Sequence, residues 1–361
     1  MTEVNANRPY YPALDGLRGV AILLVVLHHN FGFIQQSYFG WLGVDLFFVL
    51  SGFLITDILL TAVGKPNALR NFYMRRILRI FPLYYLTLIL FLFILPYFTQ
   101  KINWDYYIEN QFFLWTYLQN WLYIFKDLGY AQILNHYWSL AVEEQFYIFW
   151  PVAIILIKKP KQLLLFISIL LLLVVIFRCG LWIYKIEKLP YYNLYTFTRI
   201  DGICIGCIMA LLKYIKTDFI EKNMAFIVSA FALLNFLFYY LNSRSSFSFP
   251  YLAFIGYTTF AMMFGILVYE AAGNRSKIIN AIFDISVLKF FGRISYSFYI
   301  FHWPVYIIIN TYLAETVKNQ FPGIPGQFTI SLIATLIAAI ISWLSRQYFE
   351  SYFLKLKTRY N

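Results

Sequence analysis

The sequence predicts an all-α fold, a polytopic integral membrane bundle of about ten transmembrane helices. Of its 361 residues, 61% are hydrophobic and only 13% are charged, and the mean hydropathy is +0.64. A soluble globular domain is nearer to half apolar and a quarter charged, so we expect most of this chain to lie in lipid. The apolar residues also gather into segments of about twenty, the length that crosses the hydrocarbon core.

The whole chain, residues 1–361, is expected to form a single membrane-embedded domain, because no polar stretch is long enough to form a separate soluble one. The first apolar segment contains Asp15 and Arg18 and lacks a small-residue cleavage site, so we expect a retained span rather than a signal peptide. Cys204 and Cys207 form a C-x-x-C, which has too few ligands for a zinc site. We expect both to be small packing residues, and we predict no metal ion.

Apolar segments that are long enough to cross occur at about 13–34, 41–63, 77–98, 106–125, 137–158, 162–184, 194–213, 222–242, 252–272, 294–315 and 327–349. The segment at 106–125 is the weakest, because Glu109, Asn110 and Gln119 interrupt it. We therefore tested whether it crosses by asking where the basic residues fall, since short cytoplasmic loops are rich in Lys and Arg.

If 106–125 does not cross and the N-terminus is inside, most of the lysines and arginines fall on the cytoplasmic side. If it does cross, more of them fall outside. We therefore predict ten spans, cytoplasmic N- and C-termini, and an interfacial or re-entrant element at 106–125 that packs on protein. The net charge of +12 comes from basic residues that we expect in the cytoplasmic loops, where they face anionic lipid. It requires no nucleic-acid partner.

The first span carries two ionisable residues, which are costly in a membrane and therefore indicate function. Arg18 and His29 are eleven residues apart. At about 100° and 1.5 Å per residue they share one helix face, with His29 roughly 16 Å farther across the membrane. We expect a cation at the cytoplasmic end and an imidazole that is deep or toward the outer side. The alternative is an interfacial arginine anchor and a packed histidine pair.

The second span carries Asp45 near its outer end and Ser51 deeper. Asp45 either orients a neighbouring imidazole or caps the helix, and Gly52 permits close helix approach. Asp201 is expected to be structural, paired with Arg199 or with another buried cation.

An arginine cluster precedes the third span, where Arg79 follows Arg76 by three residues and Arg75 by four, so that it is a helix neighbour of each. Planar guanidinium donors suit phosphate groups. The alternative is ordinary anchoring of the span at the cytoplasmic surface.

Two later segments carry further polar residues. Glu143 and Glu144 lie a turn or two inside the outer boundary, where a buried carboxylate needs a partner or a proton. They point about 100° apart, so at most one faces a given cavity. Ser295, Tyr299 and His302 are spaced four and three apart and form one helix face. They either line a site or are hydrogen-bonded within the bundle.

These stretches together resemble the acyltransferase 3 family of integral membrane acyltransferases. The matching motifs, in the family's order, are DGLRG with the Arg18–x10–His29 spacing, GVDLFFVLSGFLI, RRILRIFPLYY, WSLAVEEQFYIFWP, TRIDGICIG and RISYSFYIFHWPV. The resemblance runs from about residue 9 to residue 350. Members O-acetylate bacterial lipopolysaccharide O-antigen, capsule, peptidoglycan, Nod factors and macrolides. Some members carry an additional hydrolase-like domain, which we expect this chain to lack.

The resemblance implies a membrane O-acetyltransferase of the bacterial cell (inner) membrane. It would move an acyl group, in the simplest case acetyl, from acyl-CoA to a hydroxyl of a cell-surface carbohydrate or its lipid-linked precursor. Acetyl-CoA would be a donor substrate rather than a bound cofactor. Arg76 and Arg79 match the family's Arg-x-x-Arg and, with Arg18, would bind the donor. His29 would be the catalytic base, or would itself be acylated briefly. Glu143 matches the family's carboxylate and would orient the base or bind a sugar hydroxyl.

We assign the remaining polar residues of the spans, Asp45, Ser51, Tyr299 and His302, to substrate binding. Tryptophans near the outer ends either stack on sugars or form an interfacial belt. A second function is also consistent with the residues, a transporter of a small solute or acyl intermediate in which His and Glu relay protons. Repeat symmetry and broken half-helices would indicate a transporter, and the sequence shows neither.

Overall fold

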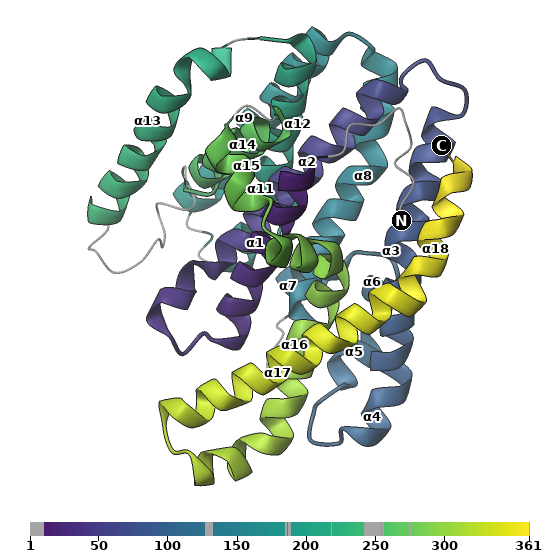
Figure 1. Cartoon of the computed structure of the whole chain (residues 1–361), viewed down its shortest axis with the longest axis vertical. Coiled ribbons are helices and arrows are strands. Elements are labelled where there is room, and N and C mark those ends of the chain that lie inside the picture. Colours follow the sequence, from purple (N-terminus) through teal and green to yellow (C-terminus); the bar gives the residue numbers. More distant parts are fainter. Residues whose placement is uncertain are drawn as a thin grey trace.

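The computed structural model describes residues 11–126, 133–184, 186, 189–217, 219–241, 254, 256–273 and 276–360. Every regular element within these residues is a helix, which confirms the all-α prediction (Figure 1). Six stretches in the described ranges are long and apolar enough to cross a membrane: Pro12–Asn30, Gln35–Ala62, Ala68–Phe98, Asn135–Ile157, Pro160–Ile183 and Ile324–Tyr360.

The predicted count of ten spans is therefore not confirmed. The predicted span at 194–213 is divided into α11 (Thr196–Arg199) and α12 (Asp201–Ile215). The predicted span at 252–272 contains α14 (Tyr257–Gly273), which has only 17 residues, and part of it lies outside the described residues. The remaining two correspond to α13 (Phe219–Leu241) and to part of α16 (Ser286–Gln320), whose apolar run is interrupted by polar side chains.

The helices of the first half are α1 (Pro12–Asn30), η1 (Gln35–Trp41), α2 (Leu42–Ala62), α3 (Ala68–Ile89), η2 (Leu90–Ile94), α4 (Leu95–Phe98), α5 (Asp105–Glu109), α6 (Gln111–Trp115), α7 (Gln119–Phe125), η3 (Asn135–Tyr137) and α8 (Trp138–Ile157). Those of the second half, besides α11 to α14 and α16, are α9 (Pro160–Ile183), α10 (Leu189–Asn193), α15 (Lys277–Phe283), α17 (Ile324–Leu344), η5 (Ser345–Glu350), α18 (Ser351–Leu356) and η6 (Lys357–Tyr360).

The weak segment at 106–125 forms the three short helices α5, α6 and α7, none of which is long enough to cross. Its polar side chains bond to protein, as expected for an element that packs on the bundle. Gln119 donates to the carbonyl of Tyr137 at 2.8 Å, and Asn120 donates to the hydroxyl of Thr196 at 2.9 Å. The side-chain nitrogens of Gln119 and Asn120 are thus both bonded within the bundle, whereas the side-chain oxygen of Gln119 is buried without a hydrogen-bond partner.

Two close helix pairs organise the bundle: α1 packs along α16, and α2 packs along α12. Glycines make both contacts possible. A Cβ atom at Gly292 of α16 would lie 1.8 Å from the carbonyl oxygen of Asp15, and one at Gly52 would lie 2.0 Å from that of Ile203. The predicted close approach at Gly52 is thus confirmed, and Cys207 packs there, with its thiol donating to the Gly52 carbonyl at 3.5 Å.

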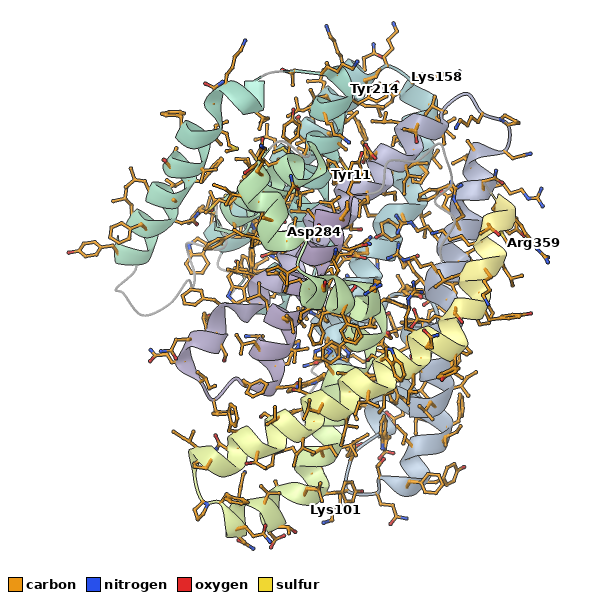
Figure 2. The ribbon with its side chains drawn as sticks, viewed as in Figure 1. Tyr11, Lys101, Lys158, Tyr214, Asp284 and Arg359 are labelled. Carbon is orange, nitrogen blue, oxygen red and sulfur yellow. The ribbon has the colours of Figure 1, made fainter. Side chains whose placement is uncertain are left out.

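Two lysines lie at the ends of the molecule and relate the structure to the predicted topology. Lys158, which the predicted topology places in the cytoplasm, and Lys101, which it places outside, lie at opposite ends of the long axis (Figure 2). Which end faces the cytoplasm stays a prediction. Residues 1–10 and Asn361, to which the prediction of cytoplasmic termini applies, lie outside the described residues.

Candidate functional site

Two cavities within the bundle are lined by the predicted site residues. The first, which we call the arginine cavity, has a volume of about 100 Å³ and is lined by Arg18, Arg76 and Arg79. The second, which we call the histidine cavity, has a volume of about 390 Å³ and is lined by His28 and His29. Arg18 and His29 both belong to α1, so one helix supplies a key residue to each cavity, as the predicted common face requires.

The arginine cavity combines three guanidinium groups with one carboxyl group, that of Glu143 from α8. Arg76 and Arg79 project together because they are one turn apart on α3. Arg18 pairs with Asp15 at 3.3 Å. The guanidinium carbon of Arg76 lies 4.8 Å from the centre of the Tyr147 ring, a cation–π contact. The excess of cations makes this cavity suited to an anionic ligand.

A chain of hydroxyl groups crosses the arginine cavity. The hydroxyl of Tyr147 donates to Oε2 of Glu143 at 3.1 Å, and it also shares a hydrogen bond with the hydroxyl of Ser51. Ser51 and Glu143 were predicted from the sequence, whereas Tyr147 was not. Its position four residues after Glu143, on the same helix face, is the signal that would have found it.

The cationic region continues beyond the arginine cavity. A smaller cavity of about 40 Å³ shares Arg76 and Arg79 with it and adds Arg75 and Lys357 to its lining. Arg75 donates to the carbonyl of Tyr360 at 2.8 Å, which fastens the C-terminal helical turn to α3. Four cationic side chains thus line the smaller cavity, three from α3 and Lys357 from η6.

All four histidines of the protein gather at the histidine cavity. His28 and His29 come from α1, His136 from η3 and His302 from α16. The rings of His136 and His302 are 5.1 Å apart, and Nδ1 of His29 lies 2.8 Å from Nε2 of His302. His136 was not singled out from the sequence, although it begins the HYWSLAVEEQ stretch. Periodicity along one helix cannot reveal a residue contributed by a separate turn.

The hydrogen bonds of His302 determine the tautomers of the histidine pair. Nδ1 of His302 faces the carbonyl oxygens of Tyr299, at 2.7 Å, and Phe298, at 3.1 Å, so this nitrogen carries the proton. If the His302 ring is neutral, its Nε2 carries no proton and is an acceptor. Nδ1 of His29 must therefore donate to Nε2 of His302. This leaves Nε2 of His29 with a lone pair and no protein partner among the described residues. A neutral imidazole in this state is a general base.

Tyr299 separates the two cavities, since it and Val44 line both. The Tyr299 hydroxyl donates to the carbonyl of His136 at 2.8 Å and accepts from the hydroxyl of Ser139 at 2.6 Å. These bonds hold the ring between the arginine side and the histidine side. Tyr299 and Val44 therefore form part of the wall between the two cavities.

The acyltransferase domain model matches residues 11–344 of the chain. The chain belongs to the acyltransferase 3 family. It is 28% identical to the peptidoglycan O-acetyltransferase OatA of Listeria monocytogenes, over 93% of this chain and 55% of that protein. It is 31% identical to the putative peptidoglycan O-acetyltransferase YrhL of Bacillus subtilis (95% and 55%) and 30% identical to the putative O-acetyltransferase SACOL0978 of Staphylococcus aureus (92% and 56%). The chain spans about half the length of these curated relatives, and no solved structure matches it.

Two predicted site residues make contacts that the sequence did not predict. Asp45 was expected to orient an imidazole or cap its helix, but it is buried and pairs with Arg199 at 2.5 Å. The residue that contacts the imidazole of His29 is His302, and its predicted part in substrate binding stays a prediction. Asp45 pairs with Arg199 because a buried carboxylate is stabilised most by a nearby guanidinium.

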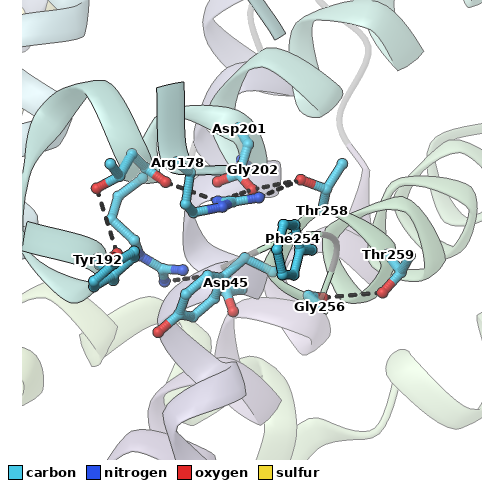
Figure 3. A network of polar contacts seen from close by, with 12 residues as sticks. Asp45, Arg178, Tyr192, Asp201, Gly202, Phe254, Gly256, Thr258 and Thr259 are labelled. Carbon is cyan, nitrogen blue, oxygen red and sulfur yellow. Dashed lines mark hydrogen bonds and ion pairs between the residues drawn. The ribbon is translucent and has the colours of Figure 1, made fainter. Parts of the chain in front are cut away.

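Glu143, predicted to act with the base, lines the arginine cavity, whereas His29 lines the histidine cavity. The structure therefore does not bring the two together. Asp201 pairs with Arg178 at 2.9 Å rather than with Arg199 (Figure 3). Thr258 completes this pair by donating to Asp201 at 2.9 Å while accepting from Arg178 at 2.8 Å. Asp201 thus lies in a saturated structural network, as its sequence context suggested.

Proposed function

We propose that this acyltransferase moves an acyl group, in the simplest case acetyl, from acyl-CoA to a carbohydrate hydroxyl. The donor binds at the arginine cavity and the acceptor binds at the histidine cavity. The observation that carries the proposal is the free Nε2 of His29, oriented by His302, in a cavity that adjoins the cationic one. The names of the relatives favour peptidoglycan or a related glycan as the acceptor.

The donor's phosphates match the cationic region between α3 and η6. Arg76 and Arg79 face both the arginine cavity and its smaller neighbour, where Lys357 adds a further cation. Charge-assisted hydrogen bonds from guanidinium to phosphate are among the strong ones. With the phosphates held there, the pantetheine arm extends through the arginine cavity, past Arg18 and Ser51, toward Tyr299. The thioester then lies at the partition between the cavities.

His29 acts as the general base in the transfer. Its Nε2 takes the proton of the acceptor hydroxyl while that oxygen attacks the thioester carbonyl. The new bond joins the oxygen to the acyl carbon, the carbon–sulfur bond breaks, and the proton passes from His29 to the sulfur of coenzyme A. His302 keeps Nδ1 of His29 bonded throughout and so fixes the ring. If His29 is instead acylated first, Nε2 bonds to the acyl carbon as the carbon–sulfur bond breaks, and the departing thiolate takes the Nδ1 proton. The acceptor oxygen then attacks the acyl carbon, the carbon–nitrogen bond breaks, and the acceptor's proton returns to the imidazole, so an acyl-His29 species accumulates without acceptor.

The membrane gives this reaction a direction. We propose that both termini lie in the cytoplasm, as the distribution of basic residues predicts, so that the arginine cavity is on the side where acyl-CoA is made and the histidine cavity is on the other side. The bundle then passes an acyl group across the membrane of the bacterial cell without moving the coenzyme. Lys158 and Lys101 at opposite ends of the molecule support this arrangement.

The test uses the purified full chain in detergent, radiolabelled acetyl-CoA and a peptidoglycan-derived glycan. We expect release of coenzyme A together with label on the glycan, and loss of both in His29→Ala. Solute uptake into liposomes without any release of coenzyme A would favour the transporter instead. Mass spectrometry of cell-surface glycans, with and without the protein, would then identify the acetylated hydroxyl.

A further inference from the structure

Arg199 lines the histidine cavity and has side-chain donor groups without a hydrogen-bond partner. The residue is only 2% exposed, and it lines the cavity. Its Nη2 donates to Asp45 at 2.5 Å, but Nε and Nη1 are buried and have no hydrogen-bond partner. Leaving a buried donor unpaired costs about 1–3 kcal/mol, and more for a charged group. A ligand in the cavity that supplied acceptors would remove this cost.

The same cavity also holds an unbonded acceptor. The side-chain oxygen of Asn135 lines the cavity, is buried, and has no hydrogen-bond partner. A ligand that satisfies both Arg199 and Asn135 must accept and donate hydrogen bonds. A hydroxyl group does both, whereas an ionised carboxylate or phosphate only accepts. The unpaired donors of Arg199 and the unpaired oxygen of Asn135 therefore point to a ligand rich in hydroxyl groups.

Aromatic rings complete the cavity wall. Trp41, Trp138 and Tyr257 line it, and the guanidinium carbon of Arg199 lies 3.8 Å from the centre of the Tyr257 ring. Flat aromatic faces offer apolar area to the C–H side of a sugar ring, while the polar groups between them fix its hydroxyls. The volume of about 390 Å³ lies within the range of about 300–1,000 Å³ that is typical of small-molecule sites.

The charge of the cavity favours an uncharged ring. The cation of Arg199 is already paired with Asp45, and the cavity lining contains no lysine, aspartate, glutamate or second arginine among the described residues. An anionic ligand would bring a second negative charge beside the buried carboxylate of Asp45, which is costly where water is excluded. A neutral ring adds no such repulsion.

The geometry points to an acceptor subsite for one uncharged pyranose ring, in which Arg199 donates to ring hydroxyls and Trp41 and Trp138 supply the stacking wall. This inference rests on the proposed function, which it deepens by stating the class of acceptor. It also makes Arg199 a determinant of acceptor specificity that is separate from the donor machinery.

The experiment is isothermal titration of the full chain in detergent, without acetyl-CoA, using triacetylchitotriose and a hyaluronan tetrasaccharide, whose alternate rings are anionic. We expect the neutral sugar to bind more tightly. Arg199→Lys keeps a cation for Asp45 but removes the Nε and Nη1 donors, so its Kd for the neutral sugar should rise about tenfold or more. Trp41→Leu should weaken binding as well, and it leaves the buried ion pair intact.

The matched control is Trp343→Leu, because Trp343 is 44% exposed on α17 and does not line the cavity. Its affinity for sugar should equal that of the parent chain. Tighter binding of the hyaluronan fragment, or unchanged affinity in both Arg199→Lys and Trp41→Leu, would overturn the inference. No sugar binding by a protein that still releases coenzyme A would overturn the subsite alone. Sugar binding without any release of coenzyme A would instead contradict the proposed function.

Discussion

The arginine cavity and the histidine cavity differ in almost every property although they share a wall. The arginine cavity is the smaller, with three guanidinium groups and a carboxyl group in its lining. The histidine cavity is several times larger and is lined by imidazole, amide and aromatic groups, with one arginine that is already paired. Among the residues that the structure describes, only Tyr299 and Val44 line both.

The difference shows how the two halves of an acyl transfer can be kept apart. A polyanionic donor needs cations, whereas a general base works best where no neighbouring cation opposes its protonation. Placing the guanidinium groups on one side of Tyr299 and the histidines on the other satisfies both requirements. The following predictions test this division, from the largest expected effect to the smallest.

Removal of the base should have the largest effect. General base catalysis contributes about 10²–10⁴-fold, so we expect His29→Ala to lower kcat by at least about a hundredfold. The KM for acetyl-CoA should change little, because His29 does not line the arginine cavity. Steady-state kinetics measure both, and an unchanged elution profile in gel filtration shows that the variant is folded. Near-normal kcat in a folded variant would refute the assigned role.

His302 should come next, as a positioning residue. His302→Leu removes the acceptor for Nδ1 of His29, so we expect kcat to fall about tenfold to a hundredfold and the pH–rate profile of kcat to move. His302→Gln retains an oxygen acceptor near the position of Nε2 and should recover part of the rate and the normal profile. A rate loss that is equal in both variants, with no change in pH profile, would indicate only a packing role.

Arg76 tests the donor side of the comparison. A hydrogen bond to a charged group is worth about 1.5–3 kcal/mol, so Arg76→Ala should raise the KM for acetyl-CoA about tenfold to a hundredfold. The affinity for the acceptor should stay the same. Arg70→Ala is the matched control, since Arg70 is an exposed arginine on the same helix that does not line the arginine cavity. Equal effects of the two variants would contradict a specific donor site.

Tyr299→Phe should have the smallest effect. The change removes the hydroxyl that bonds to Ser139 and to the His136 carbonyl but keeps the ring between the cavities. Each lost hydrogen bond is worth about 0.5–1.5 kcal/mol, so a few-fold change in kcat is expected. Tyr299→Ala should instead open the wall and raise the acceptor-independent hydrolysis of acetyl-CoA, measured as release of coenzyme A. If hydrolysis does not rise, Tyr299 is not the partition.

Several features of the site were already present in the sequence because they depend on one helix at a time. The common face of Arg18 and His29, the Arg76–Arg79 pair and the stripe from Ser295 through Tyr299 to His302 all follow from the helical repeat. The all-α membrane class follows from composition and from the lengths of the apolar segments. These predictions needed no information about which helices are neighbours.

Only the tertiary structure decided how those faces combine. The contact between His29 and His302 joins residues 273 positions apart, and the pair of Asp45 and Arg199 joins residues 154 positions apart. Nothing local specifies such partners, since they depend on glycine contacts that bring α1 to α16 and α2 to α12. The sequence by itself thus determined that the protein lies in a membrane and which polar residues share a face of each helix. Packing decided which stripes meet, and so divided them into a cationic cavity and a neutral one.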